Sequence, residues 1–225
     1  IAAGSLAAVP DDVELETAAA VMLQGLTAHY LVNDTWPLQP GQRCLLHAGA
    51  GGVGLLLIQM AKAKGAEVFA TVGNDEKAAL ASAAGADHVI VYSRDDFTSA
   101  VEEIAGPRPI DVVYDGVGKA TFAGGMALLR KRGLMVTFGN ASGPVDPVSP
   151  LELSGNGSLF LTRPSLFDYI ATAAEFETKT SQLLTQVASG ALEVRIGARL
   201  RLAEAALAHE LLESRATTGK LILIP

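Results

Sequence analysis

Short apolar runs alternate with segments of helical apolar spacing along most of the sequence. The apolar runs that predict strands occupy 43–48, 67–72, 88–92, 110–114, 133–138 and 158–162. Between them, apolar residues recur every three to four positions and predict helices over 55–62, 75–84, 95–105 and 119–130. Such an alternation predicts a doubly wound parallel α/β sheet, and the right-handed crossovers leave little freedom in its topology.

The two ends of the chain depart from this rhythm. Apolar spacing predicts a helix pair or a bent helix over 13–32 and one long amphipathic helix over 167–189. After that helix, 194–202 and 220–224 read as strands and 203–214 as a helix. This tail does not continue the alternation cleanly, so we expect it to belong to a second domain whose other strands lie elsewhere.

The composition is that of a globular chain with one substantial core. Its 225 residues are 49% hydrophobic and carry a formal net charge of -7, enough apolar material for one core or a domain and a half. The acidic balance argues against nucleic acid as the main partner. Apolar runs fall far short of the roughly 18 residues that span a bilayer, and no secretory leader opens the sequence. We therefore expect a cytoplasmic protein without membrane contact, whose single Cys44 is a buried thiol rather than a nucleophile.

The main candidate site is the glycine turn at 49–54, between the first strand and its helix. It has the spacing G-x-G-x-x-G in the strand-turn-helix setting that dinucleotide-binding proteins use. Gly49 can supply the tight turn, Gly51 lets a pyrophosphate approach the backbone, and Gly54 lets the helix press on the strand. Gly52 and Val53 open the helix, whose free N–H groups and positive dipole end face the phosphates. A triphosphatase phosphate loop is excluded, because leucines stand where that motif needs Lys and Ser or Thr.

The end of the second strand bears on the choice between NAD and NADP. NAD enzymes usually place an acid here for the ribose 2′-hydroxyl, but this strand ends at Gly73 and Asn74. Lys77, one turn into the next helix, can face a 2′-phosphate. Asp75 and Glu76 are a complication, although acids in the first turn of a helix are also expected from the helix dipole. The sequence therefore favours NADP(H), while a solvated lysine remains the alternative interpretation of Lys77.

Three further strand ends carry candidate contacts. Tyr92 ends the third strand and is placed to stack on or hydrogen-bond the adenosine half; a half-buried strand tyrosine is the alternative. The glycines around Val117 and in Phe138-Gly139-Asn140 permit close backbone approach, which suits the ribose and nicotinamide. No metal site is expected, because none of the four histidines is spaced with another ligand residue. No residue is an obvious catalytic acid, base or nucleophile.

Together these segments resemble a known family, and the resemblance covers nearly the whole chain. The residues that carry it are 47–54 (HAGAGGVG), 114–118 (YDGVG), 132–140 (RGLMVTFGN), 162–166 (TRPSL) and 213–220 (ESRATTGK). They are similar to NADPH:quinone oxidoreductases, the zeta-crystallin branch of the medium-chain dehydrogenase/reductase superfamily. The resemblance implies a dinucleotide-binding (Rossmann) domain at 21–190. It also implies that 1–20 leads in from a GroES-like catalytic domain that is missing here, and that 191–225 returns to that domain, so we expect a fragment.

The resemblance also implies roles for individual residues. The positions that match the family's NADPH contacts are Thr27, Lys77, Tyr92, Val117, Phe138, Gly139 and Arg215. Lys77 and Arg215 would face phosphate or adenine-side groups, and Phe138 would lie beside the nicotinamide ribose. Gln24 stands where zinc-dependent relatives carry a cysteine ligand, which implies the zinc-free branch. The strand at 158–162 resembles the edge through which such proteins pair as homodimers.

The activity expected from this resemblance is hydride transfer from NADPH to a quinone or a similar electrophilic acceptor. The cofactor would supply the chemistry, and the protein would supply orientation and a cleft with little water. An enoyl-thioester reductase of the same superfamily is one alternative. A non-catalytic NADPH-binding protein, with a crystallin-like or an RNA-binding role, is another, because a fold alone cannot choose among functions.

Overall fold

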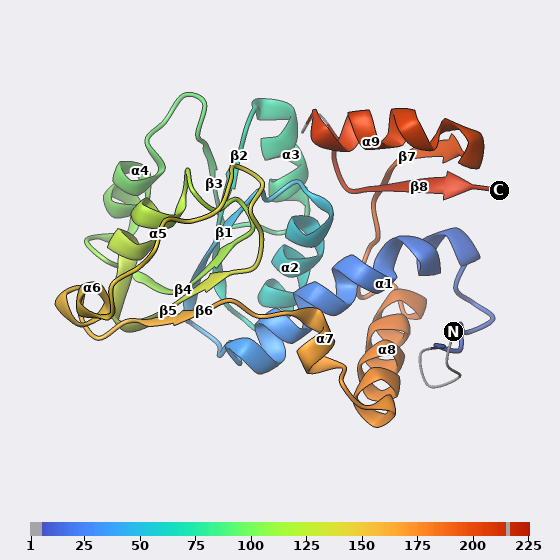
Figure 1. Cartoon of the computed structure of the whole chain (residues 1–225), viewed down its shortest axis with the longest axis horizontal. Coiled ribbons are helices and arrows are strands. Elements are labelled where there is room, and N and C mark those ends of the chain that lie inside the picture. The colour runs from blue at the N-terminus through green and yellow to red at the C-terminus, as the bar shows by residue number, and fades with distance from the viewer. Residues whose placement is uncertain (1–5, 215–216) are drawn as a thin grey trace.

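The computed structural model describes residues 6–214 and 217–225, and its main body is a six-stranded parallel sheet (Figure 1). The strand order is β3-β2-β1-β4-β5-β6, and every neighbouring pair is parallel. The strands are β1 (Arg43–His47), β2 (Glu67–Val72), β3 (His88–Val91), β4 (Ile110–Asp115), β5 (Leu129–Thr137) and β6 (Phe160–Thr162). The chain builds outward from β1 to β3 and then returns to β4, so the predicted doubly wound sheet is confirmed. Strand order reverses between β1 and β4, which is where such sheets bind ligands.

Helices cover both faces of the sheet, as the two-sided burial of the strands requires. One core contains residues of α1 (Leu15–Tyr30), α2 (Gly52–Ala63), α3 (Asp75–Ala83) and α8 (Ala173–Ala188). The other lies beneath α4 (Phe97–Ala105) and α5 (Phe122–Leu128). Successive side chains of β1 point to opposite faces of the sheet, so Leu46 belongs to the first core and Leu45 to the second.

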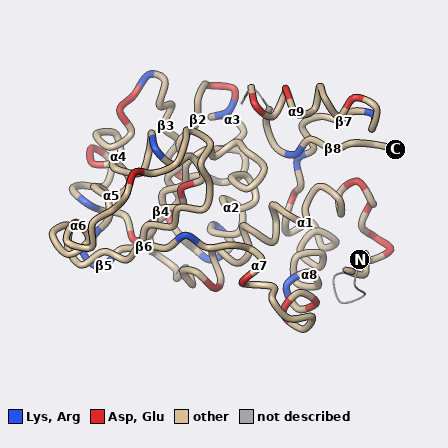
Figure 2. The backbone as a smooth tube through the Cα atoms, viewed as in Figure 1, with Lys and Arg blue, Asp and Glu red and all other residues tan. Residues whose placement is uncertain are grey.

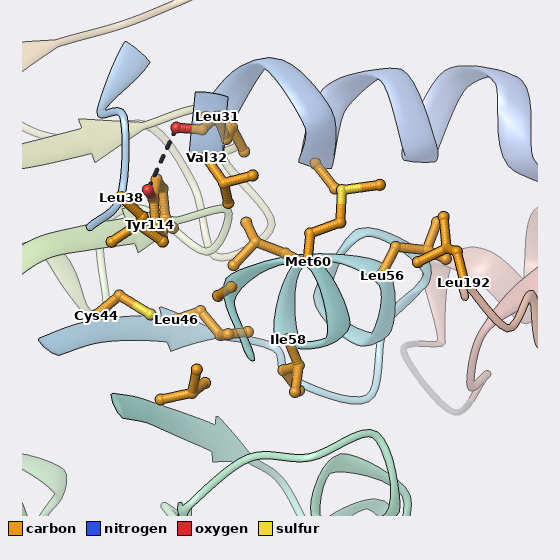
Figure 3. Close-up of a cluster of buried hydrophobic side chains, with 14 of the residues drawn as sticks. Leu31, Val32, Leu38, Cys44, Leu46, Leu56, Ile58, Met60, Tyr114 and Leu192 are labelled. Atoms are coloured by element: carbon orange, nitrogen blue, oxygen red, sulfur yellow. Dashed lines mark hydrogen bonds between the residues drawn. The ribbon is translucent and has the colours of Figure 1, made fainter. Parts of the chain in front are cut away.

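The first core fixes α2 between α1 and the sheet. Met60 points toward α1, Leu46 of β1 lies beneath α2, and Tyr114 of β4 lies nearby (Figure 3). The fully buried Tyr114 phenol donates a hydrogen bond to the Leu31 carbonyl at 3.3 Å. Leu31 begins the π-helical turn η2 (Leu31–Thr35) into which α1 passes, so the segment expected to be a helix pair or a bent helix is one α-helix followed by a π-helical turn. Cys44, in the same core, is completely buried, and burial raises the pKa of its thiol to about 12.

The residue ranges predicted for two helices were wrong. The helix expected over 119–130 is the shorter α5, because the backbone becomes extended at Leu129, where β5 begins pairing with β4. The single helix expected over 167–189 is two helices, α7 (Leu166–Tyr169) and α8. Tyr169 stacks on Tyr30 of α1 at 4.3 Å between ring centroids, and a capping box of Thr172 and Glu175 starts α8 afresh. The short helix α6 (Pro150–Gly155) was not predicted.

The tail forms a small lobe with a sheet of its own. Its elements are β7 (Ile196–Arg201), the 3₁₀ turn η3 (Leu202–Glu204), α9 (Ala205–Glu213) and β8 (Lys220–Ile224). β7 and β8 pair in parallel as a two-stranded sheet that lies apart from the main one (Figure 1). The lobe returns to the main body just before β8, where the Gly219 N–H donates to the Ala50 carbonyl of the glycine turn at 3.1 Å.

Charged residues are interspersed over both the main body and the lobe. Lys and Arg lie among Asp and Glu over most of the surface, whereas the segment leading into α1 carries only acidic residues (Figure 2). Within the described residues, no helix is long and apolar enough to pass through a bilayer.

Candidate functional site

The glycine turn joins the end of β1 to the start of α2 at the point where strand order reverses. The Gly51 N–H donates to the Ala48 carbonyl at 2.9 Å, so Gly49 is one of the two central residues of the turn, while the positive backbone angle falls on Ala48 (φ 60°). Gly49 also allows close packing on β2, since a Cβ there would lie 3.0 Å from the Ala70 Cβ. Its N–H donates to the Thr71 carbonyl at 2.9 Å, which anchors the turn to β2.

The other turn glycines allow close approaches. A Cβ on Gly54 would overlap the carbonyls of Ala48 and Gly49, so Gly54 lets α2 pack closely on the turn after β1, where the sequence analysis expected contact with the strand. A Cβ on Gly52 would overlap the side-chain amide of Gln24, which reaches across from α1. Gly51, the N-cap of α2, leaves only the Ala48 carbonyl within 4 Å of such a Cβ. The N-terminus of α2 can therefore receive an anion beside Gly51, while the Gln24 amide covers it at Gly52.

Two pockets meet at the glycine turn, and Ala48 lines both. One, of about 210 Å³, lies over the N-terminus of α2. Its lining includes Gln24, His47, Gly51, Gly52, Val53, Gly54, Tyr114, Gly116 and Phe138. The other, of about 490 Å³, lies over the ends of β2, β3 and β4. Its lining includes Thr71, Tyr92, Arg94, Asp96, Phe97, Val117, Thr121 and Ser142. A ligand with two ends joined by a charged centre can occupy both pockets while its centre crosses the turn.

A row of four buried polar side chains lies beneath the site, at the carboxyl edge of the sheet. His47 pairs with Thr71 across β1 and β2, and Asp115 pairs with Thr137 across β4 and β5. Since Leu46 pairs with Tyr114, the row runs Thr71, His47, Asp115, Thr137 on the α4 and α5 side. The sequence analysis did not identify this row, because its members are far apart in the chain and only strand register aligns them.

His47 is held neutral within this row. Its Nδ1 lies 2.8 Å from the Thr71 hydroxyl, and its ring meets the edge of Phe97 with centroids 5.0 Å apart. Burial lowers the pKa of the imidazole to about 4, and the nearby Asp115 charge offsets only part of that effect. In the described structure the His47 Nε2 and the Thr137 hydroxyl are buried without a hydrogen-bond partner. His47 is thus a buried, uncharged histidine.

Asp115 organises the loop after β4. Its fully buried carboxylate accepts hydrogen bonds from the N–H groups of Val117 and Gly118, at 2.7 and 2.9 Å, and from the Thr121 hydroxyl at 2.9 Å. The Val117 carbonyl in turn accepts from the N–H and the hydroxyl of Ser142, at 2.7 and 2.8 Å. An Asp two positions before the N–H that it binds is a known turn signal. The role of Asp115 was therefore readable from the sequence, although we interpreted only the glycines around it.

The predicted nicotinamide-side residues lie on the facing loop after β5. The Phe138 N–H donates to the Asp115 carbonyl at 2.8 Å, and its ring lies against Gly116, 3.1 Å from where a Cβ would stand. A Cβ on Gly139 would overlap the Gly116 carbonyl. Asn140 is exposed and closes the turn by accepting from Gly143. The loops after β4 and β5 are therefore packed against each other, and Gly116 and Gly139 allow this close contact.

The predicted adenine-side residues gather beyond β2 and β3. The Tyr92 phenol lies over Gly73, its oxygen 3.0 Å from where a Cβ would stand, and the side chain is 55% exposed. Asn74 caps α3 by accepting from the Lys77 N–H at 2.9 Å, which sets Lys77 in the first turn. Arg94, which the sequence analysis passed over, lies 3.2 Å from Asp75.

Several predicted contacts line neither pocket, namely Thr27, Gly49, Gly73, Lys77, Gly139 and Asn140. Thr27 lies on α1, donates to the Leu23 carbonyl at 2.7 Å, and lines neither pocket. Arg215 lies outside the described residues. Within the described parts of the chain, no three His, Cys, Asp or Glu side chains come together as a metal site would require. At the position of the relatives' cysteine ligand, the Gln24 amide rests on Gly52, so these residues do not fit a zinc ion.

Comparison with known proteins gives consistent matches along the whole chain. The zinc-binding dehydrogenase family matches residues 52–186. A quinone oxidoreductase of Salmonella typhimurium is 46% identical, with 100% of this chain and 69% of the relative covered. A 2-haloacrylate reductase of a Burkholderia species is 40% identical, with 99% and 68% covered.

Among solved structures, Escherichia coli quinone oxidoreductase complexed with NADPH superimposes with a TM-score of 0.92 at 44% identity. That match covers 96% of this chain and 67% of the other. The chain therefore spans about two thirds of the length of the proteins it resembles.

Proposed function

The chain belongs to the quinone oxidoreductase family of zinc-binding dehydrogenases, and we propose that it is the NADPH-binding part of a reductase that delivers hydride to a quinone. The observation that carries the proposal is the glycine turn between β1 and α2, with a pocket on each side that shares Ala48. A dinucleotide has this shape: two aromatic ends joined by a pyrophosphate. Free N–H groups at the start of α2 suit the pyrophosphate.

The proposal assigns the two ends of the cofactor to opposite sides of the turn. The larger pocket, lined by Tyr92, takes the adenine half; Gly73 lies against the Tyr92 phenol, and Lys77 faces the 2′-phosphate. The smaller pocket, walled by Phe138, takes the nicotinamide side. The remaining proposed contacts are Thr27, Gly49, Gly51, Gly52, Val53, Gly54, Val117, Gly139, Asn140 and Arg215. Arg94 supports NADPH over NADH, because its ion pair with Asp75 offsets a carboxylate in the first turn of α3, two positions before Lys77.

The bound nicotinamide supplies the hydride, and the residues of this chain bind and orient the nicotinamide. Clasped loops after β4 and β5 fix the wall of the smaller pocket, which favours a reactive geometry. The described residues of that pocket include no charged side chain at pH 7, since His47 is neutral. The protons that convert a reduced quinone to a quinol therefore come from solvent or from residues beyond the described chain.

The Burkholderia relative favours a second candidate, reduction of an activated carbon–carbon double bond. Quinones and such alkenes are both electrophiles that accept hydride at a conjugated carbon, so the same cofactor site serves either. An enoyl thioester is a third acceptor of this kind. An RNA-binding role for an NADPH-binding protein is disfavoured by the net charge of -7 and by the interspersed charges in Figure 2, whereas a crystallin-like structural role remains an alternative.

The test is to follow NADPH absorbance in the natural protein that carries this chain, with a quinone, a 2-haloacrylate or an enoyl thioester as acceptor. The proposal expects consumption with the quinone and little change with NADH in place of NADPH. Faster consumption with either alkene acceptor would move the assignment to that class. Saturable NADPH binding without consumption of any acceptor would indicate a binding protein instead.

Three further features belong to the proposal. The domain division sets 21–190 as the cofactor domain, with 1–20 and 191–225 joining a catalytic domain; the separate β7 and β8 sheet supports it. Homodimer pairing through 158–162 is supported by the edge position of β6 and by Phe160, which is 58% exposed. A cytoplasmic location is supported by the single Cys44, which is buried and has no internal partner.

A further inference from the structure

Arg163 follows β6 and binds the backbone on both sides of Phe138. Its Nη1 donates to the Thr137 carbonyl at 2.9 Å and to the Gly139 carbonyl at 3.1 Å. Within the part of the chain that the structure describes, Arg163 makes no ion pair. Its side-chain hydrogen bonds are therefore directed at the carbonyls around Phe138.

These two carbonyls lie beyond the sheet hydrogen bonding between β5 and β6. The last registered pair is Val136 with Thr162, so the chain after Thr137 has no strand partner on that side. Backbone carbonyls without partners leave a loop free to shift, and a planar guanidinium can satisfy two of them at once. On the other side, the loop is already fixed by the bond from Phe138 to Asp115 and by the packing of Gly139 on Gly116.

We propose that Arg163 is a positioning residue that holds the Phe138 loop from the β6 side and so fixes the wall of the nicotinamide-side pocket. This inference rests on the proposed NADPH function. Arg163 acts through the backbone of Thr137 and Gly139, so its loss affects the nicotinamide half of the cofactor. The adenine half, which lies over β2 and β3, is unaffected.

The chain contains a matched control at the other end of the same strands. Arg108 donates from Nε to the Leu129 carbonyl at 2.8 Å and from Nη2 to the Asn156 carbonyl. It thus joins the start of β5 to the segment before β6 by the same kind of bond, at the amino edge of the sheet, away from both pockets. Replacement of Arg108 tests what the loss of two arginine–carbonyl bonds does to the fold alone.

The experiment compares Arg163→Ala, Arg163→Lys and Arg108→Ala in the natural protein that carries this chain. Equilibrium titrations use two probes: NADPH, and adenosine 2′,5′-bisphosphate, which contains only the adenine half. Thermal unfolding without ligand measures the structural cost of each change. We expect Arg163→Ala to weaken NADPH about tenfold while leaving the bisphosphate within about twofold, because the misplaced wall affects one half only. Arg163→Lys should fall between the unaltered protein and Arg163→Ala, because an ammonium lacks the planar fork.

Arg108→Ala should lower the unfolding temperature without changing either affinity. The proposal is overturned if Arg163→Ala weakens both probes equally, if it weakens neither, or if Arg108→Ala reproduces its effect. A failure of the unaltered protein to bind NADPH would remove the proposed function itself, which is a separate result.

Discussion

The two sides of the glycine turn are built differently. On the side of β4 and β5, the loops are closed by bonds from Asp115, Ser142 and Arg163 and by glycines packed against each other. On the side of β2 and β3, the groups are exposed: Tyr92 is 55% exposed, and the side chains of Arg94 and Asp75 are 62% and 83% exposed. The closed side suits the cofactor end that must be held for hydride transfer, and the open side suits recognition by charge.

The largest expected effect comes from a substitution that disrupts the packing on the closed side. Gly139→Ala places a Cβ into the Gly116 carbonyl, so the two loops must separate. We expect a loss of about 2–3 kcal/mol in the free energy of unfolding, measured by urea denaturation. The control is Gly155→Ala at the end of α6, where nothing lies within 4 Å of the new Cβ. A change at Gly139 no larger than that at Gly155 would show that the closed side is not tightly packed.

The next effect concerns the buried polar row beneath the closed side. The folded pKa of His47, about 4, lies below the ordinary value of about 6.5, so the unfolded chain binds more protons between those pH values. Stability must then fall as the pH drops through this window, by roughly 2 kcal/mol between pH 7 and pH 5. Urea unfolding at both pH values should show this loss, and His47→Gln should reduce it. An unchanged pH dependence in His47→Gln would contradict a neutral buried His47.

The smallest effect tests the open side. Lys77→Gln should weaken NADPH binding about tenfold, because one charged contact to the 2′-phosphate is lost, and should leave NADH binding nearly unchanged. Fluorescence titration with both cofactors measures this difference. Lys131→Gln, at an exposed position in the first half of β5, is the matched control and should change neither affinity. Equal losses for NADPH and NADH in Lys77→Gln would remove the 2′-phosphate role.

The sequence predicted the open side more completely than the closed side. Apolar runs locate the strands and helical apolar spacing locates α2 and α3, because each signal is local. Groups that depend on strand register, such as the row from Thr71 to Thr137, carry no local signal. The role of Arg163 likewise has no local sequence signal, because its carbonyl partners are 24 and 26 positions away.

The two helix errors have the same cause. Residues 167–189 keep a helical pattern throughout, yet the stacking of Tyr169 on Tyr30 fixes α7 against α1 and forces a break before α8. In 119–130, pairing with β4 draws Leu129 into β5. Tertiary contacts therefore overrode the local pattern in both places.

The most direct test of the central claim is backbone hydrogen–deuterium exchange in the natural protein with and without NADPH. If the cofactor crosses the glycine turn, exchange slows at 49–54 and in the loops after β2, β4 and β5, while α6 and β7 are unchanged. Unchanged exchange at 49–54 at a saturating NADPH concentration, or protection confined to other elements, would contradict the proposed site.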